Sequence, residues 1–88
     1  MSDLSAYASG STEPWTADLV AALVRALQPK RLLELGAFLG LTSARLVEAM
    51  PADATLTLVE MDLDRFRECL VRFDGQERVK VYQAEALA

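Results

Sequence analysis

Two rhythms of apolar residues alternate along this chain and predict its secondary structure. In "TEPWTADLVAALVRALQ", residues 12–28, apolar positions recur three and four residues apart, which is the spacing of an amphipathic helix. The run "RLLELG", residues 31–36, is short, apolar and ends in glycine, as buried parallel strands do. The same alternation then predicts a helix over 41–50, a strand over 54–62, a helix over 63–73 and a strand over 78–84.

This order of elements predicts the fold class. Strands that alternate with helices of about ten residues favour right-handed βαβ crossovers and a parallel sheet. We therefore expect an α/β fold, with helices on the faces of the sheet. Ligands of such sheets bind beyond the carboxyl ends of the strands, so the loop "ELGAFLG", residues 34–40, is the candidate binding loop. Residues 1–13 are small and polar and are expected to form a flexible segment ahead of the domain at 14–88.

The candidate loop lacks the sequence of two well-known nucleotide-binding loops. A P-loop needs a lysine and a hydroxyl residue directly after its second glycine, and "GAFLGLT" has no lysine. A dinucleotide-binding loop needs glycines at its first, third and sixth positions, but Phe38 and Leu41 occupy the third and the sixth. Without the middle glycine the backbone cannot approach a pyrophosphate closely. A ligand that has no phosphate group fits the loop better.

Composition narrows the function classes further. The formal charge of −4 argues against a general binder of nucleic acid or of anionic membranes. The chain has no histidine, which excludes catalytic triads and metal sites that require one, and we predict no metal site. Its single cysteine, Cys69, cannot form an internal disulfide, so a reducing cytoplasm and a place in the core are expected. The N-terminal sequence shows neither a signal peptide nor a membrane span.

The stretch "LLELGAFLGLTSARL", residues 32–46, resembles the first motif of class I S-adenosylmethionine-dependent methyltransferases, an acidic residue followed by x-Gly-x-x-x-Gly. It is similar in particular to the catechol and caffeoyl-CoA types of O-methyltransferase. "TLTLVEMD", residues 55–62, looks like the end of that family's second strand, and "VKVYQAEAL", residues 79–87, is a weaker match to its third. The resemblance covers roughly residues 14–88. It implies S-adenosylmethionine as cofactor, a Rossmann-like three-layer α/β/α fold and a sheet of strand order 3-2-1.

The resemblance also implies roles for residues around the first strand. Gly36 would let the chain turn sharply after the strand, and Gly40 would let the loop lie against the ligand. Glu34 would hold the ammonium group of the cofactor, directly or through water. The helix start at 41–43 would offer backbone N–H groups to the methionine carboxylate.

Further along the chain, Glu60 would accept hydrogen bonds from the two ribose hydroxyls at the end of the second strand. Met61 would face the adenine ring, and Glu85 would accept a hydrogen bond from the adenine amino group. The complete set of predicted cofactor-binding residues is Glu34, Gly36, Ala37, Phe38, Gly40, Thr42, Ser43, Glu60, Met61 and Glu85.

Each of these residues also has a purely structural interpretation. The two glycines could serve only a tight turn and close helix packing, and Glu34 could be a solvated residue at the sheet edge. Glu60 could be an acid at the start of the next helix, together with Asp62. For Glu85 the match is weakest, because Ala84 stands where the family has glycine and glutamate replaces a shorter aspartate.

The predicted function is that of an S-adenosylmethionine-dependent methyltransferase that acts on a small-molecule hydroxyl. This chain supplies the N-terminal, cofactor-binding half, and no catalytic residue is predicted because the family's acceptor groups come mainly from after the fourth strand. One alternative is a non-catalytic module that binds a partner through its open sheet edge, and a more distant one is a fragment of a nicotinamide-dependent oxidoreductase. The first strand would keep an unpaired edge beside Leu32, Leu33 and Leu35, which predicts a homodimer or a partner chain there.

Overall fold

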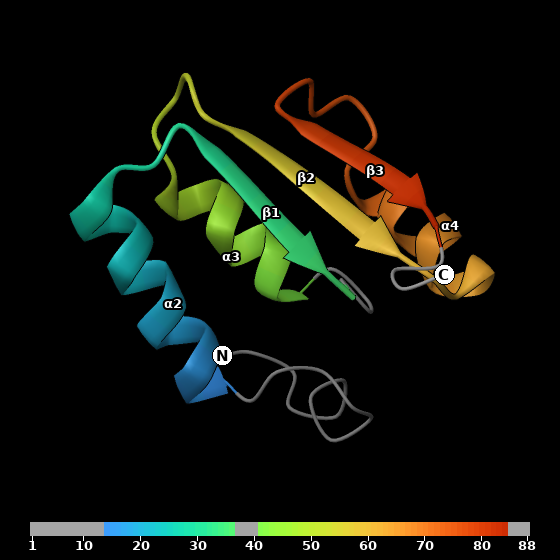
Figure 1. Ribbon diagram of the computed structural model, residues 1–88, viewed down its shortest axis with the longest axis horizontal. Helices are drawn as coiled ribbons and strands as arrows, with labels where there is room; N and C mark the ends of the chain where they lie inside the picture. Colours follow the sequence, from blue (N-terminus) through green and yellow to red (C-terminus); the bar gives the residue numbers. More distant parts are fainter. Residues whose placement is uncertain (1–13, 37–40, 85–88) are drawn as a thin grey trace.

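The structure of the chain is a computed structural model that describes residues 14–36 and 41–84 (Figure 1). The elements follow one another as α2 (Pro14–Leu27), β1 (Arg31–Leu35), α3 (Leu41–Ala49), β2 (Thr55–Glu60), α4 (Leu63–Arg72) and β3 (Val79–Gln83). All six lie where the apolar pattern predicts them, with ends that differ by at most two residues. Among these elements no helix is long and apolar enough to cross a membrane.

The three strands form one parallel sheet in the order β1-β2-β3, which is the predicted order 3-2-1 seen from the opposite edge. Leu33 lies opposite Thr57, and Thr57 lies opposite Lys80, so these rows cross the sheet from edge to edge. The prediction of a Rossmann-like α/β fold is therefore confirmed. All strands point the same way, so their carboxyl ends lie together (Figure 1). We call this end of the sheet the carboxyl edge, to distinguish it from the unpaired side of an outer strand.

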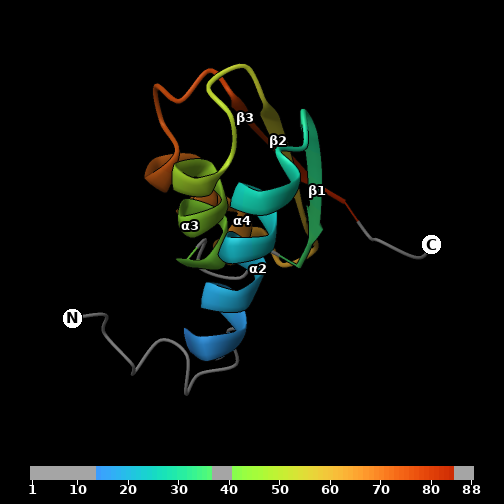
Figure 2. The same ribbon diagram turned by 90° about the vertical axis from the view of Figure 1, so that its left-hand side faces the viewer.

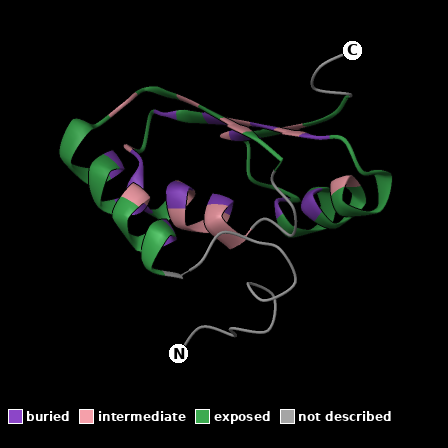
Figure 3. Ribbon diagram, turned by 60° about the horizontal axis from the view of Figure 1, so that its bottom comes forward, coloured by how far each residue is buried: buried purple, intermediate pink, exposed green. Residues whose placement is uncertain are grey.

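The three described helices lie on the same face of the sheet (Figure 2). For α3 and α4 this follows from the strand order, because two right-handed crossovers that progress in one direction place both helices on one side. The core lies between this layer and the sheet (Figure 3). It is built from Ala21, Val24, Leu46, Ala49, Met50, Ala54, Leu56, Leu58, Cys69, Phe73 and Val79. The described residues thus supply two of the three expected layers, and the opposite face of the sheet is open.

Helix α2 begins with Pro14, which suits the first position of a helix because the N–H it lacks would have no partner within the helix. Its buried residues are Ala17, Ala21 and Val24, whereas Leu19, Leu23 and others of the larger apolar residues are exposed. The sequence pattern marks an apolar stripe on this helix but does not tell which part of it faces inward. Small side chains face inward because they allow α2 to pack closely against α3.

Helix α4 is capped by Asp62, the residue before its first, whose carboxylate accepts the N–H of Arg65 at 3.0 Å. The Cys69 side chain is fully buried in the core, as predicted, and Phe73 packs beside it in the same cluster. Leu63 and Leu70, which are also apolar, are about half exposed. Only part of the apolar residues of α4 therefore faces the core.

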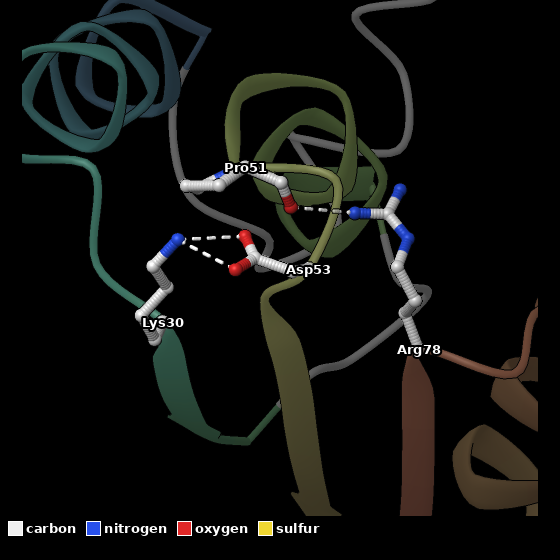
Figure 4. A network of polar contacts seen from close by, with 4 residues as sticks. All are labelled: Lys30, Pro51, Asp53 and Arg78. Atoms are coloured by element: carbon white, nitrogen blue, oxygen red, sulfur yellow. Dashed lines mark hydrogen bonds and ion pairs between the residues drawn. The ribbon is translucent and has the colours of Figure 1, made fainter.

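Polar contacts close the amino ends of the strands, opposite the candidate site (Figure 4). Lys30 Nζ forms an ion pair with both carboxylate oxygens of Asp53, at 2.8 and 2.7 Å, which joins the approach to β1 with the loop before β2. Arg78, directly before β3, donates from Nη1 to the Pro51 carbonyl at 2.9 Å. These contacts are distant from the carboxyl edge and provide control positions for experiments on it.

The open face of the sheet carries exposed apolar side chains. Leu33 and Leu35 on β1 are 66% and 61% exposed, as expected from the sequence, and Tyr82 on β3 is 52% exposed. Leu32, by contrast, points to the helix-covered face and is half-buried there. In the described part of the chain β1 pairs with β2 alone, so its other side is a sheet edge.

Candidate functional site

Gly36 directly follows Leu35, the last residue of β1. Its φ of +74° lies in the left-handed region, which residues with a side chain adopt at a cost. Its N–H donates to the Val59 carbonyl at 2.7 Å, so the turn begins directly at the end of the ladder with β2. A Cβ at this position would meet nothing within 4 Å, so the backbone requires glycine for its conformation and the space beside it is open.

Glu34 lies on the face of β1 that the helices cover. The Ser43 hydroxyl, in the first turn of α3, donates a hydrogen bond to Glu34 Oε1. The Ser43 side chain is completely buried and Glu34 is partly buried, so Glu34 is not the solvated edge residue of the structural alternative. Burial raises the pKa of Glu34 above its ordinary value, and the hydrogen bond from Ser43 lowers it by a smaller amount.

The raised pKa of Glu34 has a consequence for stability. A carboxyl that holds its proton more tightly in the folded chain than in the unfolded chain makes folding less favourable as the pH rises from about 4.5 through the folded-state pKa. We therefore expect Glu34→Gln to be more stable than the unchanged chain at pH 8 and to lose this advantage near pH 4, where Glu34 is protonated in both states. Urea unfolding at several pH values measures the difference. An advantage that does not change with pH would contradict the assignment to Glu34.

Glu60 is the last residue of β2 and is 95% buried, with 5% of its surface exposed. Its Oε2 accepts the N–H of Asp62 at 2.9 Å, so the carboxylate lies at the start of α4. Glu60 therefore does contact the start of α4, as its purely structural interpretation requires, although the residue that caps this helix is Asp62. Glu60 and Gly36 lie at the same edge of the sheet, because Gly36 bonds to Val59, the residue before Glu60.

Two further residues at this edge were not anticipated from the sequence. Gln83, at the end of β3, donates from Nε2 to the Met61 carbonyl at 2.9 Å and so ties the β2–α4 turn to the third strand. The Ala84 N–H donates to the Glu60 carbonyl at 3.2 Å. Neither contact has a sequence signal, because a glutamine after a strand is ordinary. The Met61 side chain is exposed beside them, 60% of its surface being accessible, as a residue facing a ligand would be.

The structure thus brings Glu34, Gly36, Ser43, Glu60 and Met61 to one edge of the sheet, with Thr42 half-buried in the first turn of α3. The remaining predicted residues, Ala37, Phe38, Gly40 and Glu85, lie outside the described residues. Within residues 14–36 and 41–84 there is no group of three His, Cys, Asp or Glu side chains that could hold a metal ion.

No family model matches this sequence, and no curated protein matches it. Solved structures do match. The O-methyltransferase TomG of Streptomyces achromogenes, involved in tomaymycin synthesis and crystallised with SAM, superimposes with a TM-score of 0.77 at 26% identity over 88% of this chain. A putative O-methyltransferase of Klebsiella pneumoniae gives a TM-score of 0.80 at 26% identity over 89% of this chain. An O-methyltransferase of Bacillus cereus, crystallised with SAH, gives 0.80 at 18% identity over 88% of this chain.

The chain has the class I methyltransferase fold. It spans little more than a third of these proteins, since it covers 36%, 37% and 36% of their lengths respectively. This coverage fits the prediction that the chain matches only the N-terminal part of the fold. Within the methyltransferase fold the described carboxyl edge holds the acidic residue and the first glycine of the predicted motif, together with the acid that ends the second strand.

Proposed function

We propose that this chain forms the S-adenosylmethionine site of an O-methyltransferase whose methyl acceptor is a small-molecule hydroxyl. The observation that carries the proposal is the meeting of Glu34, Gly36 and Glu60 at the carboxyl edge of a parallel sheet, where such folds bind their ligands. Structural neighbours crystallised with SAM and with SAH support it. A reducing cytoplasm, in agreement with one buried cysteine, belongs to the same proposal.

The described residues fit this cofactor. The open space beside Gly36 lets a ligand approach the backbone, and the first turn of α3 directs backbone N–H groups and a partial positive charge toward a carboxylate. Glu34 supplies a negative charge for the ammonium group. Glu60 supplies carboxylate oxygens for the ribose hydroxyls from the end of the neighbouring strand. The bound cofactor would supply a methyl group on a positively charged sulfur, which needs no protein nucleophile.

In this proposal the chain binds and orients the cofactor. Methyl transfer depends chiefly on the alignment of the acceptor oxygen with the sulfur-bound methyl group. The acidic edge also disfavours dinucleotides, since Glu34 would face a pyrophosphate with a like charge. We assign no catalytic residue to the described part of the chain.

The test is a comparison of ligands by isothermal titration calorimetry on the 88-residue chain. We expect S-adenosylmethionine and S-adenosylhomocysteine to bind at least about tenfold more tightly than NAD, a difference of roughly 1.4 kcal/mol. The reason is the acidic loop edge and the absence of the glycines that a pyrophosphate needs. Tighter binding of NAD than of S-adenosylhomocysteine would overturn the proposal in favour of the oxidoreductase.

A second candidate function is a non-catalytic module that binds a partner protein. The exposed Leu33 and Leu35 on the open sheet face favour it, because soluble monomers seldom expose neighbouring large apolar residues in this way. The same calorimetry separates the two functions. A chain that binds none of the three ligands but is folded, as judged by a cooperative thermal melt, would support the module.

A further inference from the structure

The hydrogen bond between Ser43 and Glu34 joins two side chains at the carboxyl edge, and neither the apolar pattern nor the motif accounts for it. Ser43 lies in α3, between that helix and the sheet, and none of its surface is accessible. Its neighbours in sequence on the inward face of α3 include Leu46 and Ala49, both part of the apolar core. A buried hydroxyl costs free energy unless it finds a partner, and the partner here is Glu34 Oε1.

This bond acts on the charge and on the position of the Glu34 carboxylate. A hydroxyl that donates to a carboxylate stabilises the ionised form, and it does so against burial, which favours the protonated form. It also fixes one carboxylate oxygen toward the first turn of α3. Ser43 is therefore the described side chain that opposes the effect of burial on Glu34.

The other titratable groups of this interior do not offset the burial of Glu34. Cys69 on α4 lies close enough to feel the charges of both Glu34 and Glu60, and burial together with these charges raises the pKa of its thiol. The thiol therefore stays neutral through the range from pH 5 to 8. Glu60, from the end of β2, adds a negative charge to the same surroundings, and Arg72 acts on Cys69 with the opposite sign. Arg45 on α3 is paired with Asp18 on α2.

We propose that Ser43 is a positioning residue for cofactor binding, which acts through its hydrogen bond to hold the Glu34 carboxylate ready for the ammonium group of S-adenosylmethionine. The inference rests on the proposed function and adds to it a role for the buried Ser43 side chain and a dependence on pH. A cationic ligand binds the ionised form of Glu34 better than the protonated form. Binding at a pH where part of Glu34 is protonated therefore releases a proton from that carboxyl to the buffer.

The deciding experiment measures the affinity for S-adenosylmethionine between pH 5 and 7 by calorimetry, for the unchanged chain and for Ser43→Ala, because the amino group of the cofactor keeps its charge in this range. Removal of the hydroxyl raises the pKa of Glu34 further, so the pH below which affinity falls is expected to move upward. Ser43→Ala should bind roughly tenfold more weakly than the unchanged chain at the acidic end and approach it at the alkaline end. Titrations in two buffers of different ionisation enthalpy should show the proton release.

Two control variants separate this role from a packing role. Glu34→Gln removes the titrating group and should give a weaker affinity that hardly changes with pH. Thr57→Val replaces a hydroxyl with a methyl group of similar size on the open face of the sheet, where Thr57 is half-buried. It should leave the pH profile unchanged. A Ser43→Ala affinity that is lower by the same factor at every pH would overturn the inference, because a loosened helix weakens binding without regard to pH.

A second measurement does not depend on the ligand. Carbon-13 NMR of the Glu34 carboxyl in the ligand-free chain should show a higher pKa in Ser43→Ala than in the unchanged chain. If the unchanged chain fails to bind S-adenosylmethionine, the proposed function and the cofactor role of Ser43 both fail, and the NMR titration then decides the coupling of Ser43 to Glu34 alone. Equal Glu34 pKa values in both chains would overturn the coupling, whatever the calorimetry shows.

Discussion

The Glu60→Gln variant is expected to bind S-adenosylmethionine roughly 10- to 100-fold more weakly than the unchanged chain, on the order of 1.5–3 kcal/mol. The reason is that a carboxylate accepts hydrogen bonds from two hydroxyls with both oxygens, whereas an amide offers one acceptor and no charge. The melting temperature should change little. The amide oxygen of glutamine can still accept the Asp62 N–H that Glu60 Oε2 accepts at 2.9 Å. Calorimetry and a thermal melt of both chains measure the two effects.

Asp53→Asn is the matched control for this variant. It makes the same change from carboxylate to amide at the amino ends of the strands, away from the candidate site. Asp53 forms an exposed ion pair with Lys30 there (Figure 4). Exposed ion pairs contribute little to stability, so the control should melt at nearly the same temperature and keep its affinity. An unchanged affinity of Glu60→Gln, with an unchanged melting temperature, would mean that Glu60 serves only the start of α4.

The second large effect concerns association of the 88-residue chain with itself. We expect it to form dimers or larger species at micromolar concentration, because the outer side of β1 is an unpaired sheet edge in the described part of the chain. The open sheet face beside this edge carries Leu33 and Leu35, and Val59 and Tyr82 continue the row of Leu35 across the sheet. Burial of such apolar area is the main force that favours an associated form.

Sedimentation velocity over a range of concentrations measures this association. The double variant Leu33→Lys, Leu35→Lys should shift the chain toward the monomer. Lysines on an edge strand oppose its pairing with another chain, and the substitution removes the exposed apolar side chains that association would bury. The matched control is Leu70→Lys, Val71→Lys on α4, which adds the same charge at exposed positions away from the sheet and should leave association unchanged. A strictly monomeric chain with a cooperative melt would contradict the expectation.

The sequence by itself determined the fold class and the order of the elements, and it predicted a candidate site at the carboxyl ends of the strands. Each of these follows from short windows of the chain. The 3.6-residue period of residues 12–28, the apolar run at 31–36 and the glycine at 36 are all local signals, and alternation of strands and helices then leaves few topologies. Gly36 is another local signal. Glycine is required there by its own backbone conformation, with a φ of +74°, and not by a neighbouring side chain.

Only the tertiary structure decided how the side chains of the site share their contacts. The pairing of Ser43 with Glu34 joins a helix to a strand, and it depends on how α3 crosses the sheet, which no periodicity encodes. The choice of Ala17, Ala21 and Val24 as the inward face of α2 depends likewise on the distance to α3. At the start of α4, Asp62 caps the helix and Glu60 accepts the Asp62 N–H. Which acid takes which role depends on how the chain leaves β2 and enters α4. Local patterns specify the elements, but contacts between elements depend on packing geometry.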